Sequence, residues 1–315
     1  MNAHLTRIST MTRALWPAAV TIAARLTASF AITSFSITSF AIASFSIASF
    51  AVASCMALSL HAQSPVRAAR ANDSLATNAR LQVFLLVGQS NMAGRGTVEL
   101  EDSTPVAHVW MLTQDGAWTR AVEPMHFDKP KVAGVGPGRA FGVAVAKAWE
   151  GMEIGMVPAA VGGSSIRAWE PGAADSATKT HPYDDAIARA RVAMQRGSLA
   201  GILWLQGESD GNARNAGDYE QRLLAVIANL RRDLQAPEVP FLIGQMGRFP
   251  EKPWNAFRSR VDSAHRKVAA TTPHSAFILT EGLQHRGDTI HYDAPSAREI
   301  GRRYGKQFLL MKPVP

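Results

Sequence analysis

The chain has 315 residues, of which 47% are hydrophobic, and a formal net charge of +8 at pH 7. The basic residues are scattered, and neither zinc-finger spacing nor an RNA-binding signature is present, which disfavours nucleic-acid binding. Histidine, cysteine and acidic residues show no metal-ligand spacing, so the sequence predicts no metal. The part after residue 62 is long enough to bury a core as one domain.

Residues 1–62 differ in composition from the rest of the chain. They contain three arginines and no acidic residue, and a five-residue Ser-Phe repeat runs through residues 29–53. A basic start, a long apolar middle and small residues near Ala62 are typical of a secretory signal, which predicts export to the periplasm or the medium. An uncleaved membrane anchor is the alternative, because a run of this length could span a bilayer.

The only cysteine, Cys55, follows Val-Ala-Ser and resembles the lipobox of bacterial lipoproteins, although the residues after it are apolar. Residues 63–80 are polar and Ala-rich, which predicts a flexible leader. The sequence therefore predicts a signal over 1–62, a leader over 63–80 and a globular domain over 81–315. Contact with a membrane is expected only if the signal is uncleaved or Cys55 is lipidated.

From residue 81 onward, apolar strand candidates alternate with amphipathic helical patterns. Helices are predicted around 141–149 and 219–234, and Asp293 before Pro295 predicts the cap and first turn of a last helix. Residues 95–135 lack this alternation and are expected to form an irregular excursion over the site. Strands are predicted at 82–87, 154–161, 201–205, 239–244 and 275–280.

This alternation predicts the α/β class: a parallel sheet of about five strands with helices on both faces. Sites in such sheets lie at the carboxyl ends of strands. The first predicted strand ends at Gly88-Gln89-Ser90-Asn91. A serine there can be a nucleophile if a base is near, and its N–H can face an oxyanion. An ordinary capping serine is the alternative interpretation.

Three further groups follow predicted strands. Gly162-Gly163 lets the backbone approach a ligand, although taken alone the pair is better explained as a plain tight turn. Gln206-Gly207-Glu208 places an amide, which can donate to an oxyanion, beside an acid that can accept from an imidazole. Asp288 precedes His291 by three residues, and a carboxylate on Nδ1 would leave Nε2 free to take a serine proton.

Together these four blocks resemble those of the SGNH/GDSL hydrolases. The resemblance is closer to the branch that includes carbohydrate esterase family six and the sialate O-acetylesterase domain, and it runs from about residue 82 to 310. It implies a flavodoxin-like three-layer α/β/α fold, Ser90 as nucleophile and His291 as base. Asp288 would be the third triad member, with Glu208 as a competitor or helper. The N–H groups of Ser90 and Gly163 and the amide of Gln206 would form the oxyanion hole.

The resemblance implies a serine esterase that removes O-acetyl groups from carbohydrates, such as acetylxylan or sialic acids, without a cofactor. Candidate substrate contacts are Gln89, Asn91, Arg167 and Trp169, with loop packing as the alternative for the last two. A broad-specificity small-ester carboxylesterase is a rival within the class. A non-catalytic carbohydrate-binding protein and a membrane-attached structural protein are rivals outside it. The intact set of serine, histidine and acid favours an enzyme.

Overall fold

The computed structural model describes residues 75–76 and 81–315, so the predictions for the signal, Cys55 and most of the leader lie outside the described residues. Seven strands form one sheet in the spatial order β3-β2-β4-β1-β5-β6-β7. Neighbouring strands are parallel except β2 and β3, which are antiparallel. The strands are β1 (Leu81–Gly88), β2 (Val109–Leu112), β3 (Trp118–Arg120), β4 (Glu153–Pro158), β5 (Gly197–Leu205), β6 (Phe241–Gly244) and β7 (Ser275–Ile278).

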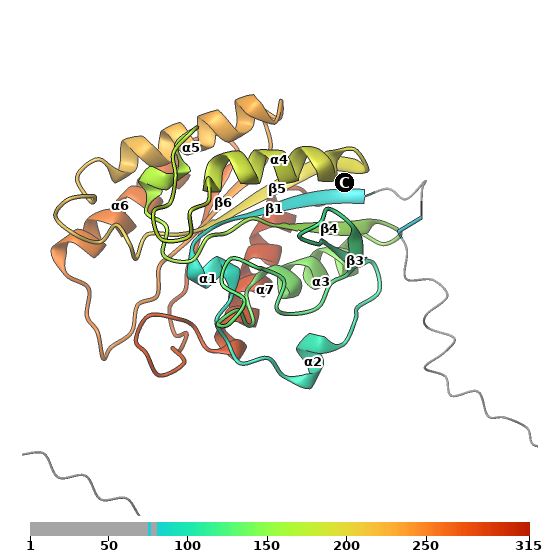
Figure 1. Cartoon of the computed structure of the whole chain (residues 1–315), viewed down its shortest axis with the longest axis horizontal. Coiled ribbons are helices and arrows are strands. Elements are labelled where there is room, and N and C mark those ends of the chain that lie inside the picture. Colours follow the sequence, from blue (N-terminus) through green and yellow to red (C-terminus); the bar gives the residue numbers. More distant parts are fainter. Residues whose placement is uncertain (1–74, 77–80) are drawn as a thin grey trace, which may run out of the picture. The chain divides into compact units, whose positions relative to one another are not determined.

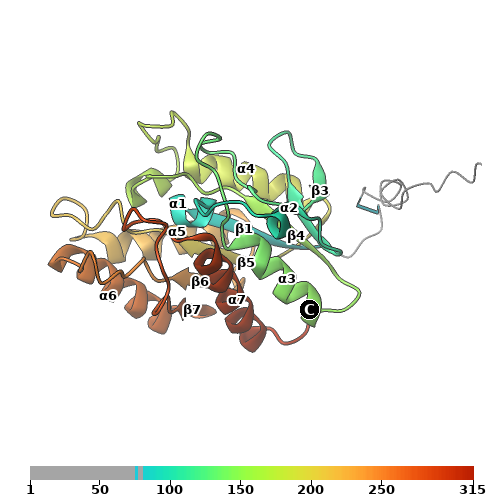
Figure 2. The ribbon, with the colours of Figure 1, turned by 90° about the horizontal axis from the view of Figure 1, so that it is seen from below.

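Helices cover both faces of this sheet (Figures 1 and 2). One face is covered by α3 (Gly138–Ala148) and α7 (Ala294–Met311). The other is covered by α4 (Pro182–Met194), α5 (Tyr219–Asp233) and α6 (Ala256–Thr271). Shorter elements are α1 (Ser90–Ala93), α2 (Leu100–Ser103) and the 3₁₀ turn η2 (Ile166–Trp169). The predicted three-layer α/β/α class is confirmed. In the described part of the chain, no helix has the length and apolar character needed to cross a membrane.

The central strand β1 shows why its sequence is a continuous apolar run. Successive side chains of a strand point to opposite faces, and both faces of this sheet are covered. Val83 and Leu85 therefore join the core beneath α4 and α5, whereas Phe84 joins the core beneath α3 and α7. The Phe84 ring meets Phe141 and Phe308 edge to face, with centroids 4.8 and 5.0 Å apart. Burial of each such side chain contributes about 1.5–3 kcal/mol.

The five predicted strands and the predicted helices are present, and Asp293 caps α7 by accepting the N–H of Ser296 at 2.8 Å. The prediction of about five parallel strands was wrong at one edge. Residues 95–135 contain β2 and β3, joined by a tight turn in which Gly116 has a φ of 85°. These strands have four and three residues, too few for alternation to give a readable signal.

The sheet order determines where a site can form. The chain reaches β4 through α3 on one face and then crosses to β5 through α4 on the other face. β1 lies between β4 and β5. The connections on its two sides run over opposite faces of the sheet, which leaves a crevice at the carboxyl end of β1. Open α/β sheets bind ligands at this switch point.

Candidate active site

Ser90 stands at the turn between β1 and α1. Gly88 has a φ of 126°, and a Cβ atom there would lie 2.2 Å from the carbonyl oxygen of Leu205 on β5. Both the conformation and the close approach require glycine. Gln89 still donates its N–H to the Leu205 carbonyl at 2.9 Å. The chain then turns into α1, which leaves Ser90 at the carboxyl edge of the sheet with 6% of its surface exposed.

The structure brings Ser90, His291 and Asp288 into one hydrogen-bonded chain. Nε2 of His291 lies 3.0 Å from Oγ of Ser90, and Nδ1 lies 2.7 Å from Oδ2 of Asp288. The other Asp288 oxygen accepts the N–H groups of Ile290 and His291 at 2.9 and 2.8 Å. Burial would raise the pKa of Asp288, but these hydrogen bonds outweigh it and lower the pKa to about 2. The carboxylate is therefore ionised at neutral pH and orients the imidazole.

Asn91 ties the histidine loop to the serine helix. Its Nδ2 donates to the Ile290 carbonyl at 3.1 Å, and its Oδ1 accepts the N–H of Tyr292 at 3.2 Å. These bonds flank His291 on both sides. Nδ2 also donates to Glu208, and the side chain is only 4% exposed. Asn91 was expected to contact substrate, but its polar atoms are occupied in holding the site together.

The glycine pair forms the turn that follows β4. The turn closes through a 3.2 Å bond from the Ser164 N–H to the Val161 carbonyl, and Gly163 occupies its third position with a φ of 84°. A type II turn requires a positive φ there. Neither the Gly163 N–H nor the Ser90 N–H has an acceptor within residues 75–76 and 81–315. Both residues line the same pocket, so these two donors are available to an oxyanion.

Gln206 departs from its expected place in the oxyanion hole. It is fully buried, and its Nε2 has three acceptors within hydrogen-bonding distance: Oδ2 of Asp210 at 2.5 Å, the Ser164 carbonyl at 3.0 Å and Oε1 of Gln89 at 3.2 Å. Its Oε1 accepts the Tyr219 hydroxyl at 2.6 Å. An amide nitrogen carries only two hydrogens, so no N–H remains for an oxyanion. Gln206 instead fastens the end of β5 to the glycine turn.

Glu208 lines the pocket with Ser90 and His291 but forms no hydrogen bond to the imidazole. Its Oε1 accepts from Nδ2 of Asn91 at 2.8 Å. Its Oε2 is buried, and within the described part of the chain nothing donates to it. Of the two candidate acids, the structure therefore places Asp288 on the histidine and leaves Glu208 beside it.

The other three expected substrate contacts are also engaged within the protein. The Gln89 side-chain oxygen accepts the N–H groups of Gly207 and Ser209, each at 3.3 Å. Arg167 pairs with Asp218 at 2.8 Å. Trp169 was expected to contact a sugar, but it is fully buried in the core. Its indole meets Trp204 edge to face, with ring centroids 5.3 Å apart. Trp169 therefore serves in packing, which was the alternative interpretation.

The pocket beside Ser90 has a volume of about 370 Å³. Three charged residues that carry no motif in the sequence line it, namely Arg95, Lys129 and Arg258. A fourth, Asp128, lies behind the glycine turn and accepts the Gly162 N–H. Arg95 and Asp128 form a buried ion pair, whereas Lys129 and Arg258 make no ion pair with any described residue. No spacing rule marks these residues, because they come together only through tertiary packing.

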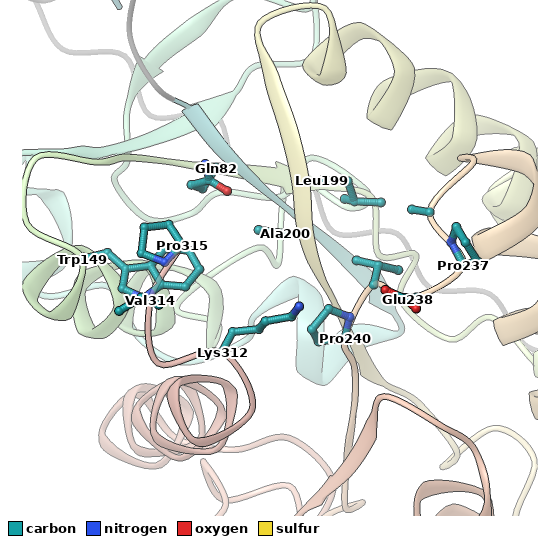
Figure 3. Close-up of a pocket in the computed structure, with 12 residues that line it drawn as sticks. Gln82, Trp149, Leu199, Ala200, Pro237, Glu238, Pro240, Lys312, Val314 and Pro315 are labelled. Atoms are coloured by element: carbon teal, nitrogen blue, oxygen red, sulfur yellow. The ribbon is translucent and has the colours of Figure 1, made fainter.

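A second pocket, of about 480 Å³, lies at the opposite ends of the strands (Figure 3). Figure 3 shows Gln82 and Ala200 from β1 and β5 beside Trp149 and the C-terminal residues Lys312 and Pro315. Its lining, within the described part of the chain, contains no serine, cysteine or histidine. This pocket therefore lacks the pairing of a hydroxyl with an imidazole that is found at Ser90 and His291.

Comparisons with known proteins place the chain among carbohydrate esterases. The chain is 30% identical over 251 residues to a probable carbohydrate esterase from Arabidopsis thaliana, covering 72% of this chain and 90% of that protein. The X-ray structure of an Arabidopsis thaliana protein matches with a TM-score of 0.64 and 29% identity, covering 73% of this chain and 98% of that one.

Two more distant structures share the fold. NanS aligns with a TM-score of 0.57 at 15% identity, covering 75% of this chain and 98% of that one. A carbohydrate acetylesterase from Xanthomonas citri aligns with a TM-score of 0.56 at 20% identity, covering 71% of this chain and 55% of that one. The family model described as carbohydrate esterase, sialic acid-specific acetylesterase matches residues 80–310. The chain therefore belongs to this family of carbohydrate esterases.

Proposed function

We propose that the protein removes O-acetyl groups from carbohydrates by a serine mechanism with an acetyl-enzyme intermediate. The observation that carries this proposal is the unbroken chain from Ser90 Oγ to His291 and Asp288, with distances of 3.0 and 2.7 Å. A non-catalytic binding protein would not need this alignment.

In the first half-reaction, Ser90 Oγ attacks the acetyl carbonyl while Nε2 of His291 takes the serine proton. The N–H groups of Ser90 and Gly163 stabilise the oxyanion. When the tetrahedral intermediate collapses, the ester bond breaks and His291 returns the proton to the departing sugar oxygen. In the second half-reaction, His291 takes a proton from a water molecule that attacks the acetyl-enzyme. The bond between Ser90 Oγ and the acetyl group then breaks, His291 returns the proton to Oγ, and acetate leaves. Asp288 stays ionised and stabilises the imidazolium in both steps.

The test is acetate release by the wild type and by Ser90→Ala. Loss of a triad member costs on the order of 10⁴-fold or more in turnover, so acetate release should nearly vanish. A serine-reactive phosphonate should label the wild type at this position and leave the variant unlabelled. Undiminished acetate release by Ser90→Ala, or no release by the wild type from any acetylated sugar, would contradict the proposal.

The charges of the pocket favour one substrate class. Lys129 and Arg258 line the pocket, and neither has a carboxylate partner within the described residues. Unpaired cations beside the reacting centre attract an anionic substrate group. We therefore infer a preference for O-acetylated sugars that carry a carboxylate, such as sialic acids, over neutral acetylxylan.

This preference can be measured as kcat/KM for O-acetylated sialic acid, acetylxylan and a simple aryl acetate. Loss of one charge-assisted hydrogen bond costs about 1.5–3 kcal/mol, so Lys129→Gln and Arg258→Gln should raise KM for the acidic sugar about tenfold or more. Lys131→Gln is the matched control, because Lys131 is exposed and lies outside the pocket lining. Equal kcat/KM values for all three substrates would instead indicate a broad small-ester carboxylesterase.

We also infer export, from the basic start and apolar repeat of residues 1–62. N-terminal sequencing of the protein made in a bacterial host separates the possibilities. A new N-terminus near residue 63 supports a cleaved signal. A lipid-modified Cys55 or an intact residue 1 would indicate attachment to a membrane instead.

A further inference from the structure

A buried ion pair supports the glycine turn from behind. Oδ2 of Asp128 accepts the N–H of Gly162 at 2.7 Å and Nη2 of Arg95 at 2.7 Å. The Asp128 and Arg95 side chains are only 2% and 4% exposed. Burial would raise the pKa of Asp128, but the hydrogen bond and charge of Arg95 and the Gly162 N–H lower it, so the carboxyl group is ionised.

Arg95 connects the same pair to the other two parts of the site. Its Nη1 donates to the carbonyl of Gly94 at 2.6 Å, at the end of the helix that begins with Ser90. Its own carbonyl accepts Nη1 of Arg286 at 2.5 Å, and Arg286 lies in the loop that carries His291. One arginine thus contacts the serine helix, the histidine loop and, through Asp128, the glycine turn.

The fit between this pair and the turn leaves little room for movement. A Cβ atom on Gly162 would lie 2.3 Å from Nη2 of Arg95 and 2.6 Å from Oδ2 of Asp128. Such distances are shorter than a van der Waals contact, so the pair lies directly against the glycine backbone. The Gly162 N–H that Asp128 accepts is one residue before Gly163, which lines the pocket.

We propose that Asp128 and Arg95 are positioning residues that hold the Gly163 N–H and the Ser90 helix at the spacing the oxyanion needs. This inference rests on the proposed esterase function. Neither side chain has to touch the substrate. A donor displaced by about 1 Å can lose about a hundredfold in rate, because it must meet the charge that develops in the transition state.

The test compares Asp128→Ala with Asp102→Ala. Asp102 is as buried as Asp128, pairs at 2.6 Å with Arg298, which also binds Glu99 and Glu101, and does not line the Ser90 pocket. We expect Asp128→Ala to lower kcat about 10²-fold with KM changed less than about threefold, because the oxyanion hole acts on the transition state. Asp102→Ala should lower the thermal midpoint but keep kcat. Asp128→Asn, which retains an acceptor oxygen, should recover part of the lost kcat.

A second variant distinguishes a loss of kcat caused by a displaced oxyanion donor from one caused by poor folding. Removing one member of a buried pair leaves an unpaired charge, so Asp128→Ala alone can fail to fold. The double variant Arg95→Met with Asp128→Leu removes both charges and should fold, yet its kcat should stay about as low as that of Asp128→Ala.

A double variant with wild-type kcat would overturn the inference. So would equal losses of kcat in Asp128→Ala and Asp102→Ala that follow their thermal midpoints, since the pair would then be only structural. If the wild type releases no acetate from any substrate, the proposed function itself fails and this inference falls with it.

Discussion

The 2.7 Å hydrogen bond between Asp288 and Nδ1 of His291 indicates that Asp288, rather than Glu208, orients the imidazole. Asp288→Asn should lower kcat on the order of 10⁴-fold. An asparagine amide can donate to Nδ1, which stabilises the tautomer with its proton on Nε2, and that tautomer cannot accept the Ser90 proton. The measurement is kcat for acetate release by folded protein, with Ser90→Ala as the lower limit.

Glu208 provides the comparison for that variant. Glu208→Gln keeps an oxygen that can accept from Asn91, which donates to it at 2.8 Å in the wild type. Its loss of kcat should therefore be much smaller than that of Asp288→Asn. If Glu208→Gln abolishes activity while Asp288→Asn retains most of it, the assignment of the two acids is reversed.

Gln206 should matter for stability more than for turnover. Gln206→Met preserves volume but removes a donor from the buried Asp210 carboxylate and from the Ser164 carbonyl. Each buried polar group left without a partner costs about 1–3 kcal/mol. Urea unfolding should show a loss in this range, while kcat of the folded variant stays within about tenfold of the wild type. A loss of about 10²–10³ in kcat at unchanged stability would return Gln206 to the oxyanion hole.

Much of the geometry of the site could be predicted from the chain alone. Ser90, Gly163, Asp288 and His291 each follow a predicted strand, and parallel strands bring their carboxyl ends to one edge. The orientation of Gln206 could not be predicted, because it depends on two buried partners, Asp210 and Tyr219, rather than on its position. The same holds for Trp169, whose surroundings in the core are set by packing.

The N-terminal cap of α7 shows how one side chain can stabilise a whole helix. Asp293 accepts the N–H of Ser296 at 2.8 Å and caps α7, which follows His291 after only two residues. Asp293→Ala should lower the free energy of unfolding by about 1 kcal/mol, the usual effect of losing such a cap. Asp293→Asn, which can still accept the hydrogen bond, should lose much less. Equal urea midpoints for all three proteins would show that the cap does not limit stability.

Elements with a long periodic signal were predictable and short ones were not. The cap of α7 and the apolar faces of α3 and α5 follow from residue type and spacing alone. The hairpin of β2 and β3 carries almost no such signal, and its pairing depends on β4 as a neighbour. An edge hairpin therefore appears where the sequence predicts an irregular excursion, and the excursion still supplies Arg95 and Asp128 to the site.

At the scale of the whole molecule, the loops of one sheet edge share their supporting residues. Arg95 contacts the serine helix and Asp128, and Arg286 of the histidine loop donates to its carbonyl. Substitutions in one loop should therefore alter the geometry of the others. Such coupling is a property of the tertiary fold, which explains why single motifs in the sequence did not reveal it.

One buried acid, Glu123, should make the stability of the whole molecule depend on pH. Burial raises the pKa of Glu123 to about 8, and the N–H groups of Met125 and Gly136 and the charge of Arg139 offset only part of that effect. The nearby Asp102 charge raises it further. The unfolded chain has the ordinary pKa of 4.5, so between these values the folded protein holds a proton that the unfolded chain has lost. The contribution of Glu123 to stability therefore falls as pH rises from about 4.5 toward 8.

Glu123→Gln removes this dependence, because the amide is neutral at every pH and keeps one oxygen to accept an N–H. We expect the variant to gain stability relative to the wild type as pH increases, by at most about 1.4 kcal/mol per pH unit. Urea unfolding of both proteins at about pH 5, 7 and 9 measures that difference. Wild-type and variant curves that stay parallel over this range would mean that Glu123 is ionised in the folded protein. In that case the hydrogen bonds from the N–H groups of Met125 and Gly136 stabilise the charged carboxylate enough to offset its burial.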